Sequence, residues 1–256
     1  MISARRPGKR FTTYRGSSPR CISTYDHGVT YAQDERAALA ALLEETGPDG
    51  PTLCEGWQTR DLVAHLVLRE RRPDAAAGVI GGPLASYTAR VQQQYLDRYS
   101  YAQLIALFRA GPPRLSVFAI PGADDAANTV EYFVHHEDVR RAAPEWTERP
   151  IDPRLSQTLW KRLKGARMFL RSAPTGLVLA TERPGNTEPP GNTEPPGNEA
   201  QQGKLDMIVA KPGSESVTVT GSPAELTLWV MGRASAAHVT FDGFDEAVER
   251  LTAWRS

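Results

Sequence analysis

The chain has 256 residues, enough for one or two domains with a real core, and its 30 basic and 30 acidic residues cancel. This balance disfavours nucleic acid as a partner, because phosphate binding usually requires a basic surface. No stretch approaches the roughly 20 apolar residues that span a bilayer, no signal peptide is evident at the basic start, and two cysteines give no disulfide framework. We therefore expect a cytoplasmic protein that binds neither nucleic acid nor membranes.

The first half of the chain has the pattern of a helical domain. Residues 1–31 are basic and without periodicity, so we expect them to be disordered, or untranslated if synthesis starts near Val29. Thr59 is expected to cap the second helix, and Pro73 to end or interrupt it. The predicted helices span 34–46, 60–72, 84–98, 101–110, 124–142 and 153–172.

The pattern changes after Pro174, where short apolar stretches with strand character begin. Strands are predicted at 176–180, 205–210, 216–220 and 237–241, with helices at 222–231 and 244–254. A repeat of Pro-Gly-Asn-Thr-Glu-Pro separates the first two strands, and we expect a disordered loop at 183–203. The sequence thus predicts a helical domain at 32–173 and a small α/β domain at 174–256.

Glu131 and His135 are ionisable residues four positions apart on an otherwise apolar helical stripe. At about 100° per residue, they share one side of the predicted helix 124–142 with Val134 and Asp138. That side should face a core, where an unpaired charge is costly. A divalent cation would offset this cost, since side chains at i and i+4 can point at one metal ion.

A third ligand must come from another segment, and His65 is the candidate because it lies on the apolar stripe of helix 60–72. Two imidazoles and one carboxylate leave coordination positions open, which is typical of a catalytic site. The set suits Zn²⁺, but also Fe²⁺, Mn²⁺ or Ni²⁺. Asp138 could orient a ligand. The alternative is that the histidines are ordinary core residues and that Glu131 pairs with an arginine such as Arg69.

Two motifs around these residues resemble a known family. The segment Gly56-Trp-Gln-Thr-Arg-Asp-Leu-Val-Ala-His65 resembles the second-helix motif of DinB-like metal-binding bundles, and more closely that of the mycothiol-dependent maleylpyruvate isomerase family. The companion motif of that family, Glu-x-x-x-His-x-x-Asp, reads Glu131-Tyr-Phe-Val-His135-His-Glu-Asp138 here. The chain looks similar to an actinobacterial-type branch of the family rather than to the isomerases themselves.

The resemblance extends to the C-terminal part, through Gly221-Ser-Pro-Ala-Glu-Leu226 and Gly232-Arg233, and covers roughly residues 32–254 without the repeat. It implies a DinB-like four-helix bundle followed by a sterol-carrier-like α/β domain. It also implies His65, Glu131 and His135 as ligands of a divalent metal, usually zinc.

The implied activity is that of a mycothiol-dependent isomerase or S-transferase, a monomer or homodimer whose partners are a small-molecule thiol and a small electrophilic substrate. A coordinated thiol is held as the nucleophilic thiolate. Arg233 is the candidate catalytic residue, because an arginine can bind a substrate carboxylate through two hydrogen bonds; a surface arginine after a helix is the alternative.

Other functions remain open on the residues alone. Metal-bound water could serve a hydrolase instead. A non-catalytic module that binds a metal or an apolar ligand is the alternative from another class. Cys54, just before the helix that carries His65, is either a redox or covalent residue or a small buried apolar one.

Overall fold

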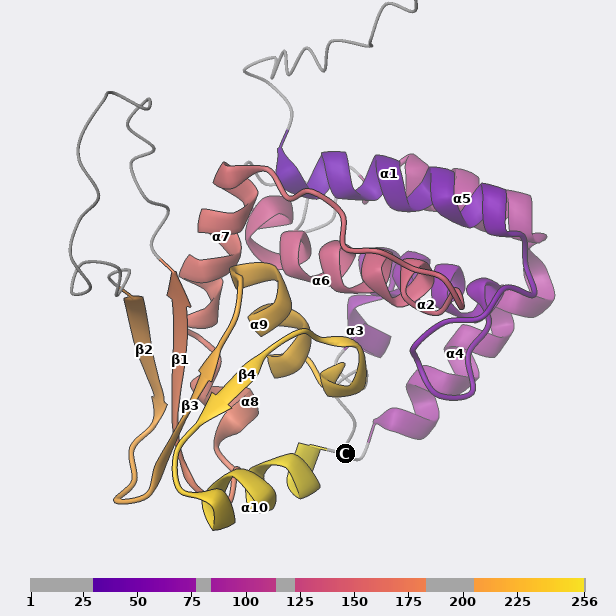
Figure 1. Ribbon diagram of the computed structural model, residues 1–256. Helices are drawn as coiled ribbons and strands as arrows, with labels where there is room; N and C mark the ends of the chain where they lie inside the picture. Colours follow the sequence, from indigo (N-terminus) through magenta and orange to yellow (C-terminus); the bar gives the residue numbers. More distant parts are fainter. Residues whose placement is uncertain (1–29, 77–83, 114–122, 183–204, 256) are drawn as a thin grey trace, which may run out of the picture.

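The computed structural model describes residues 30–76, 84–113, 123–182 and 205–255 (Figure 1). The predicted repeat loop at 183–203 lies outside these residues. So does the predicted disordered or untranslated segment 1–31, except for its last two residues. Those two belong to the first helix: Thr30 is its N-cap and Tyr31 its first residue, which places the start three residues before the predicted one.

The N-terminal part is helical. Helices α1 and α6 lie side by side, α5 contacts both α1 and α2, and α4 packs against α2. Their shared core contains Leu39, Leu66, Phe108 and Tyr132, all of them fully or almost fully buried. The helices are α1 (Tyr31–Thr46), α2 (Thr59–Arg71), α3 (Pro73–Ala76), α4 (Ala85–Arg98), α5 (Tyr101–Arg109) and α6 (Ala123–Arg140).

Local hydrogen bonds explain where α2 begins and ends. Gln58, not the predicted Thr59, is the N-cap, and the Asp61 carboxylate accepts a hydrogen bond from the Gln58 backbone at 2.9 Å. Asp61 therefore has a capping role at the start of α2. The prediction for Pro73 is confirmed, since α2 ends at Arg71 and a new short helix begins at the proline.

The C-terminal part contains a mixed four-stranded sheet in the order β2-β1-β3-β4. Strand β1 pairs with β2 in antiparallel and with β3 in parallel orientation, and β3 pairs with β4 in antiparallel orientation. Leu177, Leu179, Val217 and Val219 point to the side of the sheet that packs with Trp229 of α9. The elements are β1 (Gly176–Glu182), β2 (Leu205–Lys211), β3 (Ser216–Thr220), α9 (Pro223–Val230), β4 (Thr240–Asp242) and α10 (Asp245–Arg255).

Two predicted elements differ from the observed ones. The helix predicted at 153–172 is divided into α7 (Pro153–Leu163) and α8 (Arg167–Leu170) by a break at Gly165, where a glycine weakens the helix. The last strand begins at Thr240 rather than at 237, because a 3-10 turn (Ala234–Ala236) follows α9.

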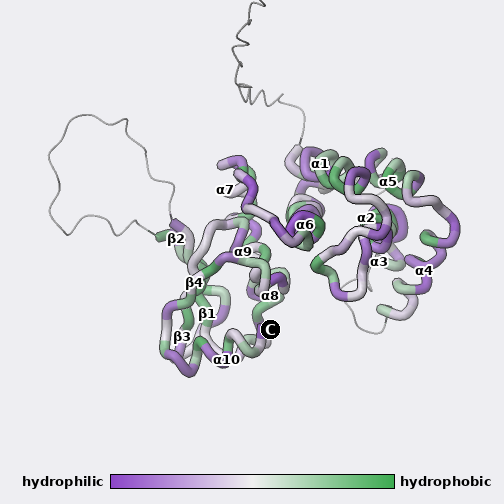
Figure 2. The backbone as a smooth tube through the Cα atoms, turned by 45° about the vertical axis from the view of Figure 1, so that its right-hand side comes forward, coloured by the Kyte–Doolittle hydropathy of each residue, from purple (hydrophilic) through white to green (hydrophobic). Residues whose placement is uncertain are grey.

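Helices α7 and α8 pack with the sheet, and α7 also packs with α6, because Leu155 and Leu159 share a core with Phe133 and Val134. Leu163 and Leu170 belong to the same core as the inward side chains of β1 and β3, and α7 contacts α9. Figure 2 shows the helical and sheet-containing parts side by side, with α6, α7 and α9 between them. The domain limits at 173/174 stay a prediction. Among the helices in the described ranges, none is long and apolar enough to cross a membrane.

Candidate metal centre

The three predicted ligands converge between α2 and α6. The His65 Nε2 atom lies 3.3 Å from Glu131 Oε1, and His135 Nε2 lies 3.2 Å from the same oxygen. The two imidazole rings meet edge to face with their centroids 5.3 Å apart. The helical arrangement thus brings together residues that are 66 positions apart in the chain.

The spacing and chemistry of these donors fit a divalent cation. In a tetrahedral zinc site with ligands at about 2.05 Å, neighbouring donor atoms are about 3.4 Å apart, close to the two nitrogen–oxygen distances here. Two imidazoles and one carboxylate also leave room for at least one further ligand. The role of the three residues as ligands remains a proposal, which is developed below.

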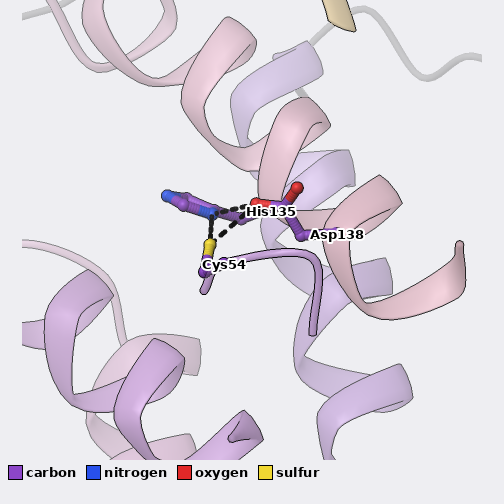
Figure 3. A group of neighbouring side chains, drawn as sticks. All are labelled: Cys54, His135 and Asp138. Carbon is purple, nitrogen blue, oxygen red and sulfur yellow. Dashed lines mark hydrogen bonds and ion pairs between the residues drawn. The ribbon is translucent and has the colours of Figure 1, made fainter. Parts of the chain in front are cut away.

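Asp138 lies behind His135. Its Oδ2 atom is 2.8 Å from His135 Nδ1 (Figure 3). The Nε2 atom of the same ring is left to face Glu131. Asp138 is fully buried. A carboxylate on the remote nitrogen of a metal-binding histidine fixes the ring and makes it a stronger donor. The geometry therefore suits the orienting role predicted for Asp138.

Arg233 reaches this group from the turn after α9. Its Nε and Nη2 atoms donate to Asp138 at 2.8 and 2.6 Å, and Nη1 donates to the Met231 carbonyl at 2.6 Å. These contacts engage most of the guanidinium, which favours a role in holding Asp138 over one in binding a substrate carboxylate. The catalytic role predicted for Arg233 stays a prediction.

Cys54 completes the cluster on the side of Asp138. Its Sγ atom donates to Asp138 Oδ2 at 3.2 Å and lies 3.9 Å from His135 Nδ1 (Figure 3). Cys54, His135 and Asp138 are also spaced closely enough to hold a metal ion. However, the Arg233 guanidinium already neutralises Asp138 and lies 3.5 Å from Sγ, so a cation there would face a positive charge. The group around Glu131 is the better candidate.

The electrostatics of the site favour ionised carboxylates. Burial alone would raise the pKa of Glu131, but hydrogen bonds from His135 and His65 hold it well below its ordinary value. Burial likewise opposes ionisation of Asp138, yet Arg233 and His135 lower its pKa to about 2. Both side chains are therefore negatively charged at neutral pH.

The pKa values of the two histidines, His65 and His135, are shifted in opposite directions. Burial lowers the pKa of His65, which keeps this imidazole neutral, as a metal ligand must be. Burial would also lower the pKa of His135, but Asp138, Cys54 and Glu131 together raise it well above its ordinary value. Metal binding at neutral pH would therefore displace a proton from His135.

Arg69 stands at the solvent side of the centre. It follows His65 by one turn on α2, and its Nε atom lies 3.4 Å from Glu131 Oε1. The side chains of Arg69 and Glu131 are 18% and 17% exposed, against 6% and 9% for His65 and His135. The ion pair considered as an alternative to metal binding is thus present, together with both histidine contacts.

Other predicted residues lie outside the centre. His136 is buried, because α1 covers that side of α6, and its Nδ1 atom lies 2.9 Å from Glu35. His238 is exposed and lies outside the strands, where it stacks on Trp146 and contacts Glu148.

A cavity of about 260 Å³ lies on another side of α6, between α7 and α9. Arg141 and Glu225 face it and pair with each other at 2.6 Å, so its charges are neutralised within the protein. His65, Glu131 and His135 do not line this cavity. The chemistry of the candidate centre therefore lies elsewhere.

Fold and site together define a protein with a helical part that carries a candidate histidine–carboxylate metal centre, joined to a mixed-sheet α/β part. Residues 29–147 match the model of the mycothiol maleylpyruvate isomerase N-terminal domain, and this part of the chain is therefore similar to that domain. The resemblance predicted from the motifs is confirmed.

A solved structure supports the same fold. The chain is similar to a crystallised histidine-to-alanine variant of the mycothiol-dependent maleylpyruvate isomerase, at 19% identity and a TM-score of 0.50, covering 83% of this chain and 90% of that one. A second crystal structure of the mycothiol-dependent maleylpyruvate isomerase is similar at 18% identity and a TM-score of 0.45, with the same coverage. A comparison with curated proteins finds no match.

Proposed function

We propose that this protein binds a divalent metal, most simply zinc, through His65, Glu131 and His135 and acts as a thiol-dependent isomerase or S-transferase on a small electrophilic substrate. The observation that carries the proposal is the convergence of two imidazole nitrogens on one carboxylate oxygen at the spacing of zinc ligands. The thiol would be mycothiol, on which the structurally similar isomerase depends.

The protein's own residues support this chemistry in distinct ways. His65 supplies a neutral nitrogen, and Glu131 supplies the negative charge. Asp138 and Arg233 hold the His135 ring in the orientation that directs Nε2 to Glu131. A divalent ion bound there would supply the Lewis acid that keeps a thiol in its thiolate form.

The finer features of the fold belong to the same proposal. The helical part would be a DinB-like four-helix bundle, and the part with the mixed sheet a sterol-carrier-like domain. We also propose a cytoplasmic monomer or homodimer that has no nucleic acid partner, in keeping with its balanced charge.

The first test is the metal content of protein purified without an affinity tag, measured by mass spectrometry. Wild type and the control His238→Ala, an exposed histidine away from the centre, should carry about one equivalent of metal. Glu131→Gln and His135→Ala should carry none. A metal-free wild type after incubation with zinc would refute the proposal.

A non-catalytic metal-binding module is the second candidate, because the described cavity lies away from the centre. The two functions differ in whether a small ligand can reach the metal. In protein loaded with cobalt, a visible spectrum that changes on addition of a small thiol would favour the enzyme. A spectrum that is unchanged at saturating thiol would favour the module.

A further inference from the structure

Arg69 connects the two helices that carry the candidate ligands. It lies one turn after His65 on α2, while Asn128 lies one turn before Glu131 on α6. The guanidinium donates to the side-chain oxygen of Asn128, and its Nε atom is 3.4 Å from Glu131 Oε1. Asn128 is fully buried, so this bridge is anchored within the helical part rather than at its surface.

The Glu131 oxygen has three nitrogen neighbours, which belong to His65, His135 and Arg69. Imidazole nitrogens that bind a metal ion carry no proton, so the two histidines could no longer donate to this oxygen. The Nε–H group of Arg69 could, because a guanidinium remains protonated in proteins. Oε1 would then be shared between an ion and Arg69.

The contact has an electronic consequence that is opposite to that of Asp138. A carboxylate behind a histidine ligand strengthens that ligand, whereas a cation that hydrogen-bonds to a carboxylate ligand draws charge away from it. The positive charge of Arg69 also repels a divalent ion directly. Both effects of Arg69 weaken metal binding. Because Arg69 also fixes the position of Oε1, it opposes a contact in which both oxygens of the Glu131 carboxylate bind the metal ion.

We propose that Arg69 is a positioning residue that holds Glu131 to a one-oxygen contact with the metal and weakens metal binding, and so keeps coordination positions open for incoming ligands. This inference rests on the proposed function of the same centre. It concerns how accessible the metal is, not which substrate is used.

The test uses cobalt(II) in the full-length protein, with affinity measured by competition against a chelator and coordination followed by the visible spectrum. Partners that contact metal ligands typically change affinity by about 10–100-fold, so Arg69→Gln should bind cobalt about tenfold more tightly than wild type. Its absorption bands should weaken as the coordination number rises. The control is Arg60→Gln, an exposed position on the same helix, which should match wild type.

The outcomes separate the two claims. Arg69→Gln that melts like wild type but binds cobalt equally or more weakly would overturn the inference and leave the metal centre intact. If Arg69→Gln does not fold, Arg69→Lys is used instead, because it keeps the charge without the Nε–H group. The visible absorption bands of cobalt-loaded Arg69→Lys should still weaken, and a wild-type spectrum would overturn the inference. Absence of metal binding in wild type would overturn both claims.

Discussion

Replacement of Asp138 by asparagine tests the geometry behind His135 most directly. The carboxylate accepts two hydrogen bonds from Arg233 and lies 2.8 Å from His135 Nδ1. An asparagine of the same shape can keep one oxygen for Arg233, but its amide group would then donate to Nδ1. The proton of His135 would move to Nε2, the atom that faces Glu131, where it blocks a metal ion.

The expected loss of affinity is large for a change of one atom. Partners of metal-binding histidines are worth about 10–100-fold in affinity, and the forced change of tautomer places Asp138→Asn at the upper end, about 2.7 kcal/mol. The fold should also lose about 2 kcal/mol, because Arg233 gives up a charged hydrogen bond while its side chain, 20% exposed, can still reach water.

Zinc affinity by chelator competition and unfolding in urea would measure the two losses separately. Asp97→Asn is the matched control, since Asp97 is exposed on α4 and accepts a hydrogen bond from Gln93 one turn earlier on the same helix. Wild-type zinc affinity in a folded Asp138→Asn protein would refute the argument that Asp138 sets the tautomer of His135.

Three further predictions concern stability. Zinc at about 100 times its Kd should stabilise wild type by about 2.7 kcal/mol in thermal unfolding and leave Glu131→Gln unchanged; equal stabilisation of both would place the zinc elsewhere. Glu225→Gln should cost about 2–3 kcal/mol in urea unfolding, because Arg141 is buried against it, whereas Glu215→Gln, at an exposed ion pair, should cost almost nothing. Burial opposes ionisation of Glu35, but His136 and Arg149 lower its pKa below the ordinary 4.5, so its contribution to stability is present above that pH and lost as the pH falls through the lowered value. Glu35→Gln should therefore flatten the acid limb of the stability curve, and an unchanged limb would contradict this assignment.

The ligand candidates could be found from sequence because helical spacing is local. Glu131 and His135 share a side of one helix, and His65 carries the same pattern of an ionisable residue among apolar neighbours. Their convergence could only be supposed, since it depends on how α2 and α6 pack. The family motifs supplied that link.

The surrounding network was harder to predict, because each contact joins distant segments. Arg233 lies 95 positions from Asp138 and reaches it only because the turn after α9 packs near α6. Burial of His136 is hard to predict for a similar reason: a helical wheel gives one apolar side, whereas α6 is covered on several sides. The signal available in the sequence was Glu35, an acidic residue among apolar residues of α1, which is the partner of His136.

The hydrogen bond from Arg233 to Asp138 means that the helical part alone does not complete its centre, and the bond from Arg141 to Glu225 is a second buried link between the two parts. A fragment that ends near residue 147, where the family match ends, would keep His65, Glu131 and His135. It would leave the buried Asp138 without Arg233, and the buried Arg141 with Glu137 as its remaining carboxylate partner. A chimera with the C-terminal half of a relative would carry the same penalty unless both arginine–carboxylate pairs were preserved. The two halves of the chain are therefore constrained to change together, although only one of them supplies the candidate ligands.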